Sequence, residues 1–186
     1  MMIRAAKRSP YIQRQDSPHL SLRSVPRGDI LKERFNMKEQ FDKRILLVVD
    51  NEVLDRYTDY YFKEHPRATK RPIPYPYHES INKWMIMKRA AMNALKQKWK
   101  AFIKWFVAEQ GYANLHIDKC EITQTIYYYT QRRHDIDNSV PKFILDGLVE
   151  SGMLIDDDDK HITELTLRCR YDAKHPRTEL LFNISK

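Results

Sequence analysis

The sequence predicts an α/β protein with a small mixed β-sheet, a long basic helix on one side and a short helix between two strands. Two observations lead to this prediction. Several short runs rich in β-branched and aromatic residues alternate apolar with polar positions, which is typical of strands. Two longer segments repeat apolar residues every three or four positions, which is typical of amphipathic helices. With 186 residues, the chain has room for one ordinary domain and an extension.

Residues 1–40 are predicted to form a flexible basic arm. Lysine and arginine recur there among serine and proline, with little periodic hydrophobicity. An arginine-rich start also fits an organelle transit peptide, although Asp16 is unusual in one.

Residues 41–70 are predicted to form a strand-helix extension. The apolar run from Arg44 to Asp50 has the size of a buried strand. The helix is expected over residues 52–65, from the spacing of three residues: Leu54, Tyr57 and Tyr61. The proline-rich segment from Arg71 to Asn82 cannot be a regular helix.

The longest predicted helix runs from Ser80 to about Gln110. Its apolar residues form one stripe, which we expect to pack in the core rather than to stack on bases: Ile81, Trp84, Met85, Met92, Leu95, Trp99, Phe102, Ile103 and Phe106. No acid occurs between Glu79 and Glu109, whereas cations occur throughout, which favours contact with phosphates. Three candidate DNA-binding residues share one face: Lys96, Lys100 and Lys104. An amphipathic helix on a membrane surface would have a similar composition.

The segment Lys119 to Thr130 is predicted to be a strand that leads into Arg132 and Arg133, two candidate phosphate contacts. Two further strands are predicted near the end of the chain from alternating apolar residues: Leu165, Leu167, Cys169 and Tyr171 in one, and Leu180, Phe182 and Ile184 in the other.

Two groups of aspartates flank one short predicted helix between these strands. Asp135 and Asp137 are two residues apart, so in an extended segment their carboxylates point the same way and need a cation between them. Asn138 or Ser139 can cap the helix that follows. Lys142 then comes out in the first turn, next to the aspartate pair.

The second group, residues 156–159, follows Gly152, which is expected to end the helix. A helix this short lets the chain bring the second group back toward the first. Oxygen ligands of this kind suit magnesium or manganese.

This order of residues resembles the RusA family of Holliday junction resolvases. The shared pattern is D-x-D-N, a lysine, an aspartate four residues later, a glycine, and a D-D run followed closely by a hydrophobic residue. The resemblance covers residues 71–186, including a proline-rich approach to an asparagine. It implies a RusA-like endonuclease domain that uses Mg²⁺ (or Mn²⁺) to cut branched DNA, above all four-way junctions, as a homodimer. By similarity, the metal ligands are Asp135, Asp137 and Asp157, with Asp156 beside them, and Lys142 on the short catalytic helix is needed for cleavage.

The chain departs from the family pattern in two ways. Three residues, rather than the usual two, separate Asn138 from Lys142, so the lysine could be rotated relative to the usual site. Counting forward from Gly152 matches Asp156 and Asp157 to the family's pair, whereas counting back from Ile162 matches the next two aspartates, Asp158 and Asp159.

Three other interpretations of the acidic residues stay open. A calcium loop of the EF-hand type would need glycine where Val140 stands. A solvated acidic loop is the second. The third is a non-catalytic DNA-binding protein that keeps the fold.

Composition supports a nucleic-acid partner. The chain carries 33 Lys and Arg against 25 Asp and Glu, and because several acids are gathered in one segment, the remaining surface is more basic than the net charge of +8 suggests. Cys120 and Cys169 have no second cysteine nearby, so neither a disulfide framework nor a zinc site is predicted. No apolar run approaches the roughly 20 residues of a membrane span, and no signal peptide is recognisable. We therefore expect a cytoplasmic protein, in a bacterium or a phage-infected cell, with no membrane partner.

Overall fold

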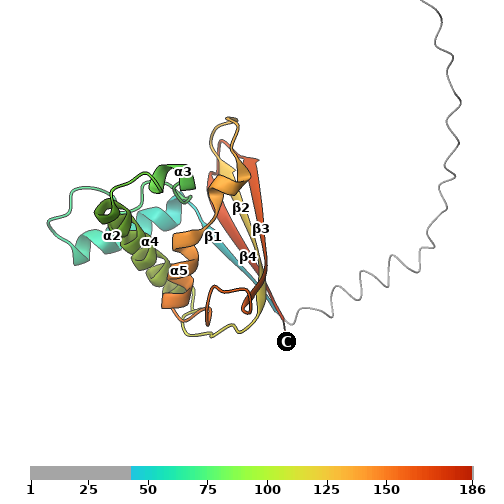
Figure 1. Ribbon diagram of the computed structural model, residues 1–186. Coiled ribbons are helices and arrows are strands. Elements are labelled where there is room, and N and C mark those ends of the chain that lie inside the picture. Colours follow the sequence, from blue (N-terminus) through green and yellow to red (C-terminus); the bar gives the residue numbers. More distant parts are fainter. Residues whose placement is uncertain (1–42, 186) are drawn as a thin grey trace, which may run out of the picture. The chain divides into compact units, whose positions relative to one another are not determined.

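The computed structural model describes residues 43–185, and these residues confirm the predicted α/β class with a small mixed sheet (Figure 1). The strands are β1 (Lys43–Val49), β2 (Cys120–Tyr128), β3 (Ile162–Tyr171) and β4 (Arg177–Ile184). They form a four-stranded sheet in the order β1-β4-β2-β3. β2 and β3 run parallel, and the other neighbours run antiparallel. The predicted basic arm, residues 1–40, lies outside the described residues.

One face of the sheet is apolar because the strand register aligns the alternating residues of all four strands. Phe182 of β4 is opposite both Ile45 of β1 and Ile122 of β2, and all three are almost fully buried. Gln124 is a polar exception on this face. Its Nε2 donates a 2.6 Å hydrogen bond to the carbonyl oxygen of Ser139, which ties β2 to the segment that carries the first aspartate pair.

The helix α2 (Asn51–Glu64) confirms the helix predicted over residues 52–65. Asp50 caps it by accepting a 2.9 Å hydrogen bond from the backbone nitrogen of Val53. Tyr57 is buried against the core. Within residues 43–185, no helix combines the length and the apolar character that crossing a membrane requires.

The prediction of one helix from Ser80 to Gln110 is wrong at its beginning. The chain forms a short helix α3 (Ile81–Trp84), a turn, and then the long helix α4 (Arg89–Glu109). Lys88 is extended, with φ −58° and ψ 141°, and Met85 and Ile86 are 66% and 85% exposed. The apolar residues of the turn do not face the core, so burial does not hold it in a helix.

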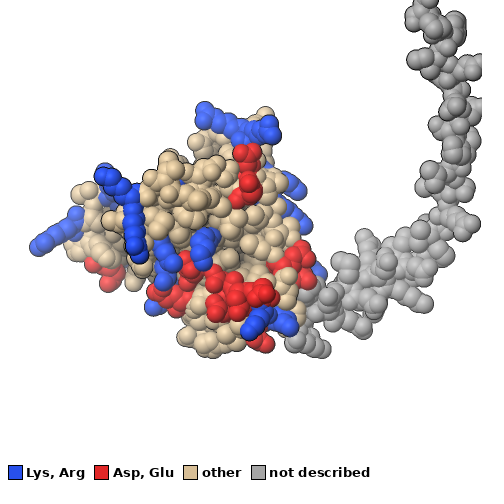
Figure 2. Space-filling model, in the orientation of Figure 1, with Lys and Arg blue, Asp and Glu red and all other residues tan. Residues whose placement is uncertain are grey.

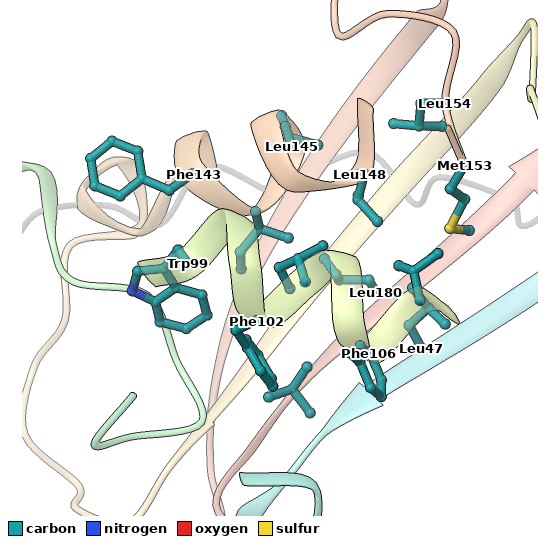
Figure 3. Packing of buried hydrophobic residues seen from close by; sticks show 14 of the residues in the cluster. Leu47, Trp99, Phe102, Phe106, Phe143, Leu145, Leu148, Met153, Leu154 and Leu180 are labelled. Carbon is teal, nitrogen blue, oxygen red and sulfur yellow. The ribbon is translucent and has the colours of Figure 1, made fainter. Parts of the chain in front are cut away.

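The apolar stripe of α4 is confirmed where the helix is continuous. Trp99, Phe102 and Phe106 are buried, and Figure 3 shows them in one cluster with Leu148 of α5 (Lys142–Glu150) and Leu180 of β4.

The two helices α4 and α5 approach closely at Gly147. A Cβ atom at that position would lie 2.7 Å from Cβ of Ile103, which is closer than real carbon atoms pack. The lack of a side chain at Gly147 therefore allows α5 to approach α4 this closely.

The predicted cap of the short helix is also wrong. Asn138 and Ser139 belong to a separate 3₁₀ turn, η1 (Ile136–Ser139), and Pro141 is the residue that precedes α5. Proline disfavours helical backbone in the residue before it, and Val140 is accordingly extended, with ψ 128°. The aspartate pair and Lys142 therefore lie on two distinct elements.

Candidate active site

The segment between the parallel strands β2 and β3 carries both acidic groups. The chain leaves the carboxyl end of β2, passes Asp135 and then the turn η1, which contains Asp137, and returns along α5 to the amino end of β3. The second group precedes β3. In the chain, α5 therefore lies between the two acidic groups.

Lys142 occupies the centre of a cluster of ion pairs on α5. Its ammonium nitrogen lies 3.4 Å from Oδ1 of Asp146 and 3.4 Å from Oδ2 of Asp157. The other oxygen of Asp146 lies 2.9 Å from the ammonium of Lys96 on α4. Burial lowers the pKa of Lys142, but the charges of Asp146 and Asp157 raise that pKa by more, so the net pKa lies above its ordinary value. Lys142 is a cation at neutral pH, held against the second acidic group.

Two of the three predicted DNA-binding lysines of α4 are paired with acids of α5. Lys96 contacts Asp146, and Lys100 forms an ion pair with Glu150. Lys104 forms no ion pair within residues 43–185 and is exposed. The contact of these lysines with phosphate stays a prediction, and the structure shows that Lys104 is the least engaged of the three.

The aspartates of the second group have different local partners. Oδ1 of Asp158 accepts hydrogen bonds of 3.0 and 3.1 Å from the backbone nitrogens of Lys160 and His161, and a shorter one involves the His161 ring. The bond to the His161 ring is the main reason why the pKa of Asp158 is lowered. Asp158 therefore closes the turn before β3, whereas Asp157 faces Lys142. This geometry favours the forward count from Gly152.

The backbone at the end of α5 also helps to place Asp157 near Lys142. Gly152 has φ +71°, a conformation that disfavours other residues, and it ends α5 sharply. The chain after it runs beside residues 116–117, with hydrogen bonds from His116 to Gly152 and from Ile117 to Met153. This anchoring fixes the start of the acidic run beside α5.

Asp135 lies at a cleft of about 360 Å³ between β2, the proline-rich segment and η1. The cleft is also lined by His78, Glu79 and His134. Oδ2 of Asp135 lies 3.5 Å from Nδ2 of Asn138, a weak contact, and Asp137 is exposed. Most oxygens of the first pair are therefore free to bind a cation or solvent.

Arg132 and Arg133 line a second hollow, at the carboxyl ends of β2 and β3. Arg170 and Tyr171 of β3 complete it, and Tyr128 and His134 border both hollows. The His134 ring stacks on Tyr128 with 3.6 Å between ring centres. The sequence analysis missed Arg170, because only the pairing of β2 with β3 places it beside Arg133.

The three predicted metal ligands are not gathered into one group. Within residues 43–185, no three His, Cys, Asp or Glu side chains are arranged to hold a metal ion. Figure 2 shows acids in several places on one face, among them a small group near the basic end of the sheet and a larger band over α5 and the loop after it. The carboxylate oxygens of Asp135, Asp137 and Asp157 are nevertheless the donors that magnesium prefers.

Comparison with known proteins gives no family for this chain: no protein-family model matches it, and no curated protein matches it significantly.

Proposed function

We propose that this protein is a structure-specific endonuclease of the RusA type, which hydrolyses phosphodiester bonds in branched DNA and resolves Holliday junctions in recombination and repair. One observation supports this most directly: the contact between Lys142 and Asp157. These are two residues to which the sequence pattern assigns a catalytic role, and they lie far enough apart in the chain for the contact to depend on the fold.

Asp135, Asp137 and Asp157 would hold Mg²⁺ or Mn²⁺, with Asp156 beside them. A metal bound there supplies activation of water and neutralisation of charge on the scissile phosphate. Lys142 adds a cation near the attacking or leaving oxygen. Because it remains protonated at neutral pH, it can do so without a change of protonation state.

The arginines at the carboxyl ends of β2 and β3 would bind the DNA backbone beside the scissile phosphate. Arg132, Arg133 and Arg170 form no ion pair within the described part of the chain. The Arg170 guanidinium donates one 3.0 Å hydrogen bond to the carbonyl oxygen of Cys169, which leaves its other donors for phosphate. The lysines of α4 extend the positive surface. A homodimer working in the cytoplasm would cut two strands of a four-way junction symmetrically.

A non-catalytic DNA-binding protein is the second candidate. It is favoured by the separation of the acidic groups and by the engagement of Lys142 with Asp146 and Asp157. In that case the acids serve only to order the segment around α5.

A labelled four-way junction, incubated with and without Mg²⁺, distinguishes the two functions. Cleavage that needs Mg²⁺ and disappears in Asp157→Asn supports the nuclease. Binding of the junction without cleavage at any Mg²⁺ or Mn²⁺ concentration supports the DNA-binding protein. Analytical ultracentrifugation of the same sample tests the homodimer.

A further inference from the structure

A groove of about 600 Å³ lies between α2 and α4, away from the acidic groups. Three tyrosines, one tryptophan and two lysines of α4 are among the residues that line it. The residues that matter for its chemistry are Tyr57, Tyr60, Tyr61, Trp105, Lys98 and Lys104. α2 precedes the segment that resembles the RusA family, so the groove depends on the extension.

The aromatic rings of the groove pack on one another and on the hydrophobic core. Tyr60 is 43% exposed, and its ring lies 5.9 Å from that of Trp105 at an angle of 25°. It lies 6.2 Å from the ring of Tyr57 at 26°. Tyr57 is buried and packs against Phe102 of the core with 5.0 Å between ring centres. An incoming flat ring would meet rings that already pack against one another and against the core.

The charges around the groove are mainly positive and unpaired. Lys98 and Lys104 form no ion pair within residues 43–185, in contrast to Lys96 and Lys100, which face α5. A neighbouring hollow shares Tyr61 and adds Arg67. The groove also contains one acid, Glu64.

We propose that this groove binds unpaired bases of single-stranded DNA, which stack on Tyr60 and Trp105 while Lys98 and Lys104 hold the adjacent phosphates. A flat ring joined to a phosphate matches both features, whereas an apolar peptide matches only the aromatic one. The choice of DNA rests on the proposed function, since branched substrates such as flaps and forks carry single-stranded arms with unpaired bases. Binding in the groove requires neither the metal nor Lys142.

The test compares two oligonucleotides of equal length, oligo-dT and its abasic analogue, with the full-length protein in EDTA. Fluorescence anisotropy gives both affinities. We expect tighter binding of oligo-dT, and a loss of about tenfold in that affinity for Tyr60→Ala, with the abasic analogue bound as before. Tyr75→Ala is the matched control, since Tyr75 is 49% exposed but does not line the groove, and it should change neither affinity.

The lysines are tested in the same assay. Lys98→Gln with Lys104→Gln should weaken both oligonucleotides and flatten the dependence of log affinity on log salt by about 0.7 per contact removed. Lys63→Gln is the control, because Lys63 is exposed on α2 and does not line the groove. Tyr60→Leu keeps the bulk of the side chain without its π-face and serves if the alanine variant fails to fold.

Oligonucleotides with 5-iodouracil locate the base directly. Photo-crosslinks at Tyr60 or Trp105 support the proposal. Crosslinks only at other residues, or equal affinity for oligo-dT and its abasic analogue, overturn it. A groove filled by residues 1–42 or by a protein partner would give these negative results. The binding assay contains no metal, so it is independent of the cleavage assay. Base-dependent binding without junction cleavage would reject only the proposed nuclease function. Junction cleavage without base-dependent binding would reject only the proposed binding of bases in the groove.

Discussion

The ammonium nitrogen of Lys142 lies 3.4 Å from Oδ2 of Asp157, although 15 residues separate the two along the chain. The contact exists because Gly152 reverses the chain at the end of α5 and directs the acidic run back along the helix. Lys142 also faces Asp146, so one cation is shared by two carboxylates. A metal bound by Asp157 would compete with Lys142 for the same oxygen.

We predict that Asp135→Asn and Asp137→Asn each abolish cleavage of a four-way junction and leave binding intact or tighter. Each substitution removes a charge that would hold the metal, and also removes repulsion of phosphate. A gel shift and a cleavage assay on the same protein measure both effects. Cutting at near wild-type rates would show that these residues do not bind the metal.

Within the second acidic group, Asp157→Asn should reduce cleavage far more than Asp159→Asn. Asp157 faces Lys142, whereas Asp159 is exposed and makes no hydrogen bond or ion pair among the described residues. Single-turnover cleavage rates at saturating Mg²⁺ provide the comparison. The opposite ranking would show that the backward count from Ile162 is the correct one.

Among the lysines of α4, Lys104→Gln should flatten the slope of log affinity against log salt for duplex arms by about 0.9. Lys96→Gln and Lys100→Gln should each change it less, because both lysines are paired with acids of α5. The triple variant sets the upper limit, roughly three units. An unchanged slope in a folded triple variant would mean that α4 does not touch DNA.

Stability should fall as the pH drops from about 6.5 toward about 4, because of His78. Burial lowers the pKa of His78 to about 4, against the opposing effects of the Glu79 carbonyl and of the charges on Glu79 and Asp146. The unfolded chain binds a proton below pH 6.5 that the folded chain accepts only near pH 4, so up to roughly 3 kcal/mol of stability is lost in that window. Urea titrations of wild type and His78→Phe at several pH values measure this, and the variant should lack this component.

Gly147→Ala should destabilise the protein by about 1–3 kcal/mol. In an exposed helix this substitution usually stabilises, but here the new methyl group would meet Ile103. The free energy of unfolding from urea denaturation gives the sign. A gain in stability would show that α4 and α5 can move apart without cost.

The strands and the buried part of α4 could be predicted from the sequence, because an element that is buried on one face repeats its apolar residues at a regular spacing. Trp99, Phe102 and Phe106 followed from that spacing. The turn between Trp84 and Arg89 could not be predicted in this way, since it contains neither glycine nor proline and the lysines continue through it.

The site was less predictable, because it depends on contacts between elements. The pattern of charges suggested that Lys96 and Lys100 are free for DNA, and their acidic partners come from α5, which is distant in the chain. Arg170 could be recognised as a neighbour of Arg132 and Arg133 only from the pairing of β2 with β3. Trp105 lies beside the apolar stripe of α4, and α2 is what makes it part of a groove.

The last strand in chain order, β4, lies inside the sheet between β1 and β2. β1 has no other strand partner among the described residues, and it reaches β4 across more than a hundred residues. On the ribosome, β1 therefore leaves the exit tunnel long before the strand that it must pair with. Its apolar residues Ile45, Leu47 and Val49 stay unpaired until β4 has been synthesised. The sheet can close only after β4 has emerged, and until then its first strand is a site at which nascent chains can aggregate.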